Sequence, residues 1–226
     1  MKKYFCSALF VLIVFTASTQ SLSKTEQKIV SGIDAAMPAT IELLKASVNI
    51  NSGTFNVDGV KKTGQLYARE LEALGFTVIW IPMPDSLKRA GHLVAYRKRK
   101  KGKRLLLIGH LDTVFEPGMP PNPFTMLDDS TATGQGVNDM KGGDVLVIAA
   151  LKALQQQKLL DNTTITVYFT GDEENAGEPR DISRGDFIDR AKQHDIALAF
   201  EGATGLNTVA TARRGASEWK LEVEAK

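Results

Sequence analysis

Side chains that could bind a metal ion or move a proton follow three apolar stretches of the sequence, residues 105–108, 164–169 and 196–200. If these stretches are neighbouring strands of one sheet, their carboxyl ends meet at one edge, where ligands bind in α/β folds. One more acidic residue stands just before a helix that is predicted to start near residue 143. The six candidates are His110, Asp112, Asp139, Glu173, Glu174 and Glu201.

So many carboxylates indicate a bound cation, because like charges in one crevice repel one another unless a cation neutralises them. One imidazole with several carboxylate oxygens and no thiolate suits a hydrolytic Zn²⁺ site, with Mn²⁺ or Co²⁺ in its place. A carboxylate can bridge two such ions, and the ions can share a water molecule and lower its pKa. The residue types therefore predict metal-dependent hydrolysis.

Other chemistry follows from the spacing of the candidates. Asp112, two residues after His110, is placed to hydrogen-bond the imidazole and fix its tautomer. Glu173 and Glu174 point in different directions from an extended segment, so one can bind metal while the other acts as a general base. Taken singly, His110 could be structural, the glutamate pair could be surface charge, and Asp139 could cap a helix. Their joint position at strand ends favours the metal site.

The elements that must position these residues predict an α/β fold. Apolar periodicity predicts helices at residues 24–48, 60–74, 143–157 and 187–193, and strands at 76–81, 92–96, 105–108, 164–169 and 196–200. The alternation of strands and helices predicts a mixed, mostly parallel sheet with helices on both faces. The basic run at 97–104 is interpreted as a solvated hairpin turn, with a patch for an anionic ligand as the alternative.

The first 23 residues predict a secretory signal peptide. Lys2 and Lys3 precede an apolar run at 4–17 that is short for a membrane span, and small and polar residues follow it. An uncleaved membrane anchor is the alternative. Cleavage would remove Cys6, the single cysteine, and would leave 28 − 2 = 26 basic against 26 acidic residues. We therefore expect a secreted or periplasmic protein without disulfides or a stable membrane anchor, and nothing in its charge indicates nucleic-acid binding.

Three segments resemble the signature motifs of the zinc amidohydrolase and exopeptidase superfamily, which includes acetylornithine deacetylase, succinyl-diaminopimelate desuccinylase and glutamate carboxypeptidase. They are His110-Leu-Asp112-Thr-Val, Gly136-Val-Asn-Asp139-Met-Lys-Gly-Gly and Asp172-Glu173-Glu174, in this order. The likeness extends from the first helix after the signal peptide to the end of the chain. Phe115-Glu-Pro and Gly75-Phe-Thr-Val are most similar to the glutamate carboxypeptidase branch.

The resemblance implies a role for each candidate. Asp139 would bridge two Zn²⁺ ions, His110 and Glu201 would complete one site, and Glu174 would contribute to the other. Glu173 would be the general base, and a cis peptide would follow Asp139. The expected substrate is a small peptide or an N-acyl amino acid, with release of a C-terminal glutamate-like residue. Alternatives are a deacylase or aminopeptidase of the same superfamily, or a secreted binding protein without activity.

The resemblance also implies a domain organisation. Residues 24–214 would form the N-terminal part of the catalytic domain, and 215–226 the first strand of an incomplete lid and dimerisation domain. Within that strand Trp219, Leu221 and Val223 alternate, which predicts an apolar face without a partner in this chain. A histidine ligand of the second ion would lie outside the sequence. We expect the complete protein to be a homodimer and the 226-residue chain alone to be weakly active or inactive.

Overall fold

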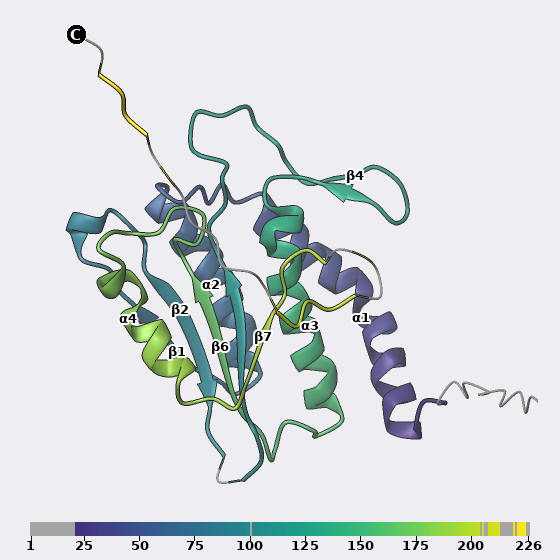
Figure 1. The fold of residues 1–226 in the computed structure, drawn as a ribbon. Helices are drawn as coiled ribbons and strands as arrows, with labels where there is room; N and C mark the ends of the chain where they lie inside the picture. The colour runs from purple at the N-terminus through teal and green to yellow at the C-terminus, as the bar shows by residue number, and fades with distance from the viewer. Residues whose placement is uncertain are drawn as a thin grey trace, which may run out of the picture.

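A mixed five-stranded sheet forms the centre of the structure (Figure 1). The computed structural model describes residues 21–99, 101–203, 205, 208–212, 219 and 221–224. The strands, in the spatial order β1-β2-β6-β3-β7, are β1 (Thr77–Ile81), β2 (His92–Arg97), β6 (Thr164–Thr170), β3 (Arg104–His110) and β7 (Ile196–Ala199). β3 pairs in parallel with β6 and β7, whereas β2 is antiparallel to both of its neighbours. The predicted mixed sheet is thus confirmed.

Helices cover both faces of this sheet, as predicted. The helices are α1 (Lys24–Val48), α2 (Val57–Ala73), α3 (Gly142–Gln156) and α4 (Arg180–Ala191). α2 and α3 pack on one face with α1 against α3, and α4 lies on the other face (Figure 1). Because side chains alternate along a strand, Val167 and Phe169 of β6 face α2 and α3 while Tyr168 faces α4. The Tyr168 ring packs on Phe187 of α4 at a centroid distance of 4.8 Å.

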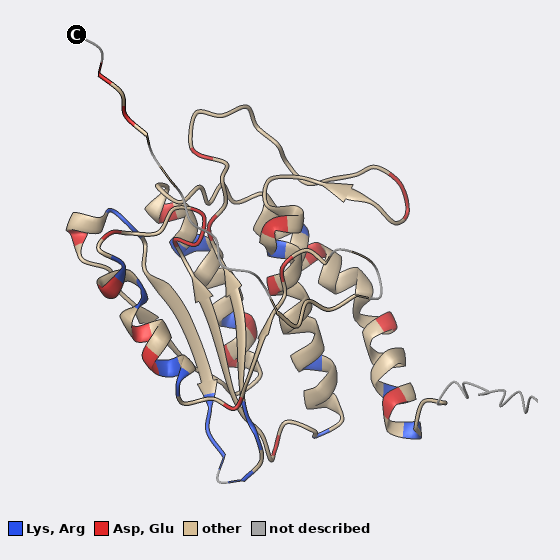
Figure 2. Cartoon of the chain, in the orientation of Figure 1, with Lys and Arg blue, Asp and Glu red and all other residues tan. Residues whose placement is uncertain are grey.

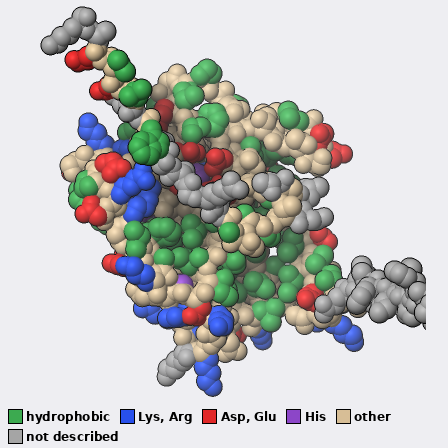
Figure 3. Space-filling view, viewed as in Figure 1, with side chains coloured by type: hydrophobic (Ala, Val, Ile, Leu, Met, Phe, Trp, Pro, Cys, Tyr) green, Lys and Arg blue, Asp and Glu red, His purple; other side chains and the backbone are tan. Residues whose placement is uncertain are grey.

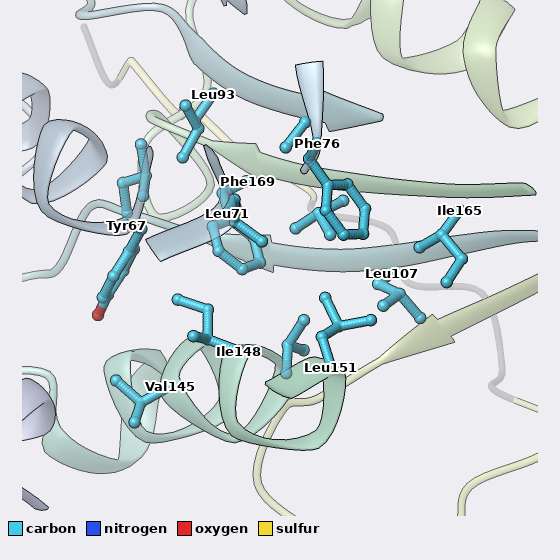
Figure 4. Close-up of a cluster of buried hydrophobic side chains, with 14 of the residues drawn as sticks. Tyr67, Leu71, Phe76, Leu93, Leu107, Val145, Ile148, Leu151, Ile165 and Phe169 are labelled. Carbon is cyan, nitrogen blue, oxygen red and sulfur yellow. The ribbon is translucent and has the colours of Figure 1, made fainter. Parts of the chain in front are cut away.

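The main core lies between the sheet and the helices α2 and α3 (Figure 4). Its side chains include Tyr67 and Leu71 of α2, Ile148 and Leu151 of α3, and Phe169 of β6, all of them buried. Each large apolar side chain contributes about 1.5–3 kcal/mol when it is removed from water. This core fixes the strands whose ends carry the candidate residues.

The helix boundaries reflect local capping. Ser23 and Glu26 form a reciprocal capping box at the start of α1. Gly75, with φ 77°, follows the end of α2 as predicted for a helix C-terminus. The prediction of a helix at 187–193 was wrong in its start, because α4 begins at Arg180 directly after Pro179. The first turns of α4 are mostly polar, so they carry little apolar periodicity.

The predicted hairpin at residues 97–104 was wrong. β2 and β3 are not neighbours, because β6 lies between them and pairs with both. The basic segment therefore connects two separated strands. It lies at the end of the sheet opposite the carboxyl ends of β3 and β6, where acidic residues gather (Figure 2). Its last residue, Arg104, forms an ion pair with Asp195 at 2.7 Å. The long loop after β3 contains the short strands β4 (Thr125–Met126) and β5 (Ala132–Thr133), and a 3-10 helix η1 (Asp85–Leu87) precedes β2.

Two predictions concern the ends of the chain. Most of the predicted signal peptide falls on residues 1–20, which lie outside the described residues. Among the helices that are described, none combines the length and apolarity of a membrane span. Of the predicted lid strand at 215–226, Trp219 and residues 221–224 are exposed and belong to no strand, and the other positions lie outside the described residues. This strand stays a prediction.

Two glycines allow a matched test of packing next to the sheet. A Cβ atom at Gly171, which follows β6, would overlap the carbonyl oxygen of Gly91 and lie 2.9 Å from Val60 Cγ1. Gly171→Ala is expected to lower the free energy of unfolding by about 1–3 kcal/mol, because backbone must shift. Gly185 of α4 has no atom near that position, so Gly185→Ala should raise it by about 0.5–1 kcal/mol. Urea denaturation measures both, and equal effects would contradict this packing.

Candidate metal centre

The topology brings the predicted site residues to one edge of the sheet. His110 is the last residue of β3, Glu173 and Glu174 follow β6, and Glu201 follows β7. β3 lies between β6 and β7, and all three run in the same direction. Their carboxyl ends therefore meet, and acidic side chains gather there in the space-filling view (Figure 3). This is the edge at which the sequence predicted the site.

Three of the predicted ligands form a compact group. His110 Nε2 lies 3.1 Å from Asp139 Oδ1 and 3.5 Å from Glu201 Oε1. One possible ligand atom from each residue lies within 4.8 Å of the others. His110 is buried, and together with Glu201 it lines a pocket of about 1260 Å³ that Glu173 and Glu174 also line, while the Asp139 side chain is largely exposed. A buried imidazole that faces open carboxylates suits a cation entering from this pocket.

Asp139 comes from a short turn, η2 (Val137–Lys141), that leads into α3 and whose backbone is not helical at Asp139 and Met140. The peptide bond between Asp139 and Met140 is cis, as the resemblance implied. The turn is tied to the end of α1 by Lys141, which is fully buried and whose Nζ donates to Ser47 O at 2.9 Å and Ile50 O at 2.7 Å. Burial lowers the pKa of Lys141 to about 7. Two carbonyl acceptors thus hold this turn in place beneath the site.

The two glutamates after β6 occupy different positions. Glu173 Oε2 lies 4.0 Å from His110 Nε2, and burial with the charge of Glu201 raises the pKa of Glu173 against the opposing charge of His110. Glu174 Oε1 is buried and has no hydrogen-bond partner in the part of the chain that the structure describes. Burial, together with the charge of Asp139, raises the pKa of Glu174 to about 7. An oxygen buried without a partner fits a metal ligand, because burial of an unpaired carboxylate is otherwise costly.

Asp112 lies against the His110 imidazole with both its backbone oxygen and its carboxylate. His110 Nδ1 lies 3.0 Å from the backbone oxygen of Asp112 and 3.5 Å from its carboxylate Oδ1. The backbone carbonyl is thus the nearer acceptor. Burial opposes the charged imidazole, but the side chains of Asp112 and Glu201 raise the pKa of His110 to about 12. The Asp112 carboxylate also accepts hydrogen bonds from the backbone N–H groups of Glu173 at 2.9 Å and Glu174 at 3.1 Å.

A second buried network, which the sequence did not predict, holds the segment that follows Glu174. Asp172 is fully buried, forms an ion pair with Arg184 of α4 and accepts a hydrogen bond from Gly177 N at 2.8 Å. His92 lies beside it, with Nε2 2.9 Å from Ser183 O and Nδ1 accepting from Gly171 N at 3.1 Å. His92 is therefore structural in this network. The spacing of these residues carries no motif from which their pairing could be recognised.

Comparison with known proteins relates this geometry to one family. Residues 106–217 match the model of peptidase family M20/M25/M40. Carboxypeptidase G2 of Pseudomonas sp. (strain RS-16) is 32% identical over 200 residues, which cover 86% of this chain and 46% of that protein. Succinyl-diaminopimelate desuccinylase of Acidiphilium cryptum (strain JF-5) is 32% identical over 138 residues, 60% of this chain and 32% of that protein.

A solved structure supports the fold independently. Human carnosine dipeptidase 1 superposes with a TM-score of 0.65 and 20% identity, covering 78% of this chain and 41% of the human protein. At this level of identity the likeness concerns the fold alone. The chain spans less than half of the length of each of these three proteins.

Proposed function

Because residues 106–217 carry a domain of peptidase family M20/M25/M40, a family of metal-dependent hydrolases, we propose that the protein hydrolyses a peptide or amide bond with two zinc ions. The observation that carries the proposal is the convergence of ligand atoms from His110, Asp139 and Glu201 within 4.8 Å. Imidazole and carboxylate without thiolate suit zinc, with Co²⁺ or Mn²⁺ as substitutes. These three residues would hold one ion, and Asp139 with Glu174 would contribute to the second.

The proposed mechanism assigns the proton transfers to Glu173. When bound, the ions lower the pKa of a water molecule and polarise the scissile carbonyl group. Glu173 lies beside His110 without belonging to the compact ligand group. Its raised pKa suits a carboxylate that accepts a proton from water and then donates it to the leaving amine. Asp112 holds the backbone of Glu173, and the residue lines the pocket.

The proposed reaction is that of a carboxypeptidase that releases a C-terminal glutamate-like residue. The support is the 32% identity with carboxypeptidase G2 over 86% of this chain, together with the resemblance of residues 75–78 and 115–117 to the glutamate carboxypeptidase branch. A deacylase of N-acyl amino acids is the second candidate, favoured by the 32% identity with a desuccinylase. Since the chain spans 46% of carboxypeptidase G2, the activity is proposed for the whole protein, and the 226-residue chain alone is proposed to be weakly active or inactive.

The remaining proposals rest on the sequence. The basic and apolar pattern of residues 1–23 supports export to the periplasm or the exterior, with no stable membrane anchor after cleavage. The resemblance of residues 215–226 to the first strand of a dimerisation domain supports a homodimer of the whole protein.

Metal content and substrate choice test the proposed function together. Inductively coupled plasma mass spectrometry of the zinc-loaded whole protein should find two zinc ions per chain. Dialysis against a chelator should abolish hydrolysis. N-acyl-glutamate and peptides with C-terminal glutamate should be cleaved at least tenfold faster, in kcat/KM, than the same compounds with C-terminal lysine or with an amidated C-terminus. Hydrolysis unaffected by complete removal of metal would contradict the metal mechanism. Cleavage of amidated peptides at the N-terminus would instead favour an aminopeptidase.

A further inference from the structure

Thr54 contacts Asp112 of the candidate metal centre from a segment to which the proposed mechanism assigns no role. It lies between α1 and α2 and is 1% exposed. Its Oγ1 donates a hydrogen bond to Asp112 Oδ2 at 2.7 Å. The segment itself is fixed beside the end of β3, because Thr54 N donates to Thr113 O at 3.2 Å and Thr113 N donates to Ser52 O at 2.9 Å. Two backbone hydrogen bonds thus hold this segment beside Thr113.

The acceptor of this hydrogen bond also holds the backbone of Glu173, the proposed base, and of Glu174, the proposed ligand. Asp112 Oδ1 accepts from Glu173 N at 2.9 Å, and Oδ2 accepts from Glu174 N at 3.1 Å. Oδ2 is therefore shared between the Thr54 hydroxyl and the Glu174 amide. The Asp112 side chain is fully buried, so no bulk water can replace a lost donor without cost.

A fixed donor matters here because of the geometry of aspartate. The last torsion of an aspartate side chain is broad and roughly two-fold, so the carboxylate plane is weakly determined by the chain itself. Three donors from two separate segments determine it in this site. Hydrogen bonds to an ionised acceptor are about twice as strong as neutral ones. Burial opposes the charged form of Asp112, but contacts with His110 and then Thr54 keep the pKa of this carboxyl below its usual value.

We propose that Thr54 is a positioning residue of the metal centre. Its hydroxyl fixes the carboxylate plane of Asp112, and Asp112 in turn places the backbone of Glu173, the proposed base, and Glu174, the proposed ligand. The inference rests on the proposed function, because it assigns to Thr54 an effect on metal binding. A residue that merely filled space would be replaced without loss by valine, which has nearly the same shape and no hydroxyl.

The test measures Co²⁺ binding to the 226-residue chain. Calorimetry gives the dissociation constant, and the visible absorption of the bound ion reports its surroundings. Thr54→Val is expected to raise the dissociation constant about 10- to 100-fold, the usual effect of losing an outer contact of a metal site, and to alter the absorption spectrum. Thr54→Ser keeps the hydroxyl donor to Asp112 and should therefore keep the dissociation constant within about threefold of that of the unchanged protein. The matched control is Thr63→Val, since Thr63 is also fully buried and its hydroxyl donates to Gly59 O at 3.1 Å inside α2. This control should leave Co²⁺ affinity unchanged.

A double-mutant cycle separates positioning from a general loss of stability. If Thr54 acts through Asp112, Thr54→Val should cause no further loss of affinity in a protein that already carries Asp112→Ala. Co²⁺ affinity of Thr54→Val equal to that of the unchanged protein, or losses that add up in the double mutant, would overturn the proposal. Should circular dichroism show Thr54→Val to be unfolded, Thr54→Ala takes its place with the same thresholds. Failure of the unchanged 226-residue chain to bind Co²⁺ at all would instead contradict the metal site of His110, Asp139 and Glu201, on which the proposed function rests.

Discussion

Glu173→Gln is expected to leave the metal content unchanged and to lower kcat about 10²- to 10⁴-fold, the usual contribution of a general base. Glutamine has the shape of glutamate but cannot accept a proton from water at neutral pH. The hydrogen bond from position 173 to Asp112 comes from the backbone N–H, so the substitution should preserve it. Steady-state kinetics of the whole protein with the preferred substrate, together with metal analysis of the same sample, measure both quantities.

Glu42→Gln is the matched control for this substitution. Glu42 lies on the exposed side of α1, where it pairs with Lys45 at 3.8 Å, and the same change there should leave kcat and metal content as they were. An unchanged kcat in Glu173→Gln would remove Glu173 from the mechanism. A loss of zinc would show that it is a ligand, and the base would then have to be sought elsewhere.

Asp139→Asn is expected to weaken zinc binding by more than about 100-fold. Replacing a residue that only supports a ligand already lowers metal affinity about 10- to 100-fold, and Asp139 is itself a proposed ligand. The carboxylate of Asp139 lies 3.1 Å from His110 Nε2 and is proposed to contact both ions. Asparagine keeps the size of the side chain but removes the negative charge that offsets the cations. Competition with a chelating dye measures the zinc affinity directly, and hydrolysis should fall with it.

Asp129→Asn provides the control for Asp139→Asn. Asp129 is exposed in the short connection between β4 and β5, and its replacement should leave the zinc affinity within about threefold, the scatter expected of surface positions. Equal zinc affinities in Asp139→Asn and the unchanged protein would contradict the proposed bridging role. Thermal unfolding of the metal-free proteins should be similar for both variants, because the Asp139 side chain is itself largely exposed.

The edge of the sheet that holds the site was predictable because it depends on local patterns. Apolar strands that end in His110, Glu173 and Glu201 must place these residues at one edge once the strands run in parallel. The buried helix faces follow from apolar periodicity in the same way. These signals lie within short segments, so they can be read without knowledge of the neighbours in space.

Contacts between distant segments were not predictable in this way. The insertion of β6 between β2 and β3 replaces the expected hairpin, since strand pairing depends on which apolar faces can be buried together and not on proximity in the chain. The acceptor role of Asp112 toward two backbone N–H groups, and the donation from Thr54, need the folded geometry. The ion pair between Asp172 and Arg184 likewise follows from the packing of α4 on the sheet. The first turns of α4 are mostly polar, so apolar periodicity did not predict this part of the helix.

The parallel order β6-β3-β7 has a consequence for the lifetime of the protein. An ion held by His110 and Glu201 would cross-link two positions that are far apart in the chain, and closing long loops costs the unfolded chain more entropy than closing short ones. Binding to the native state alone adds about 2.7 kcal/mol of stability when free metal is at 100 times its dissociation constant. Protein molecules without metal should therefore be digested faster by proteases than molecules with metal. The amount of intact protein would then depend on the concentration of available zinc.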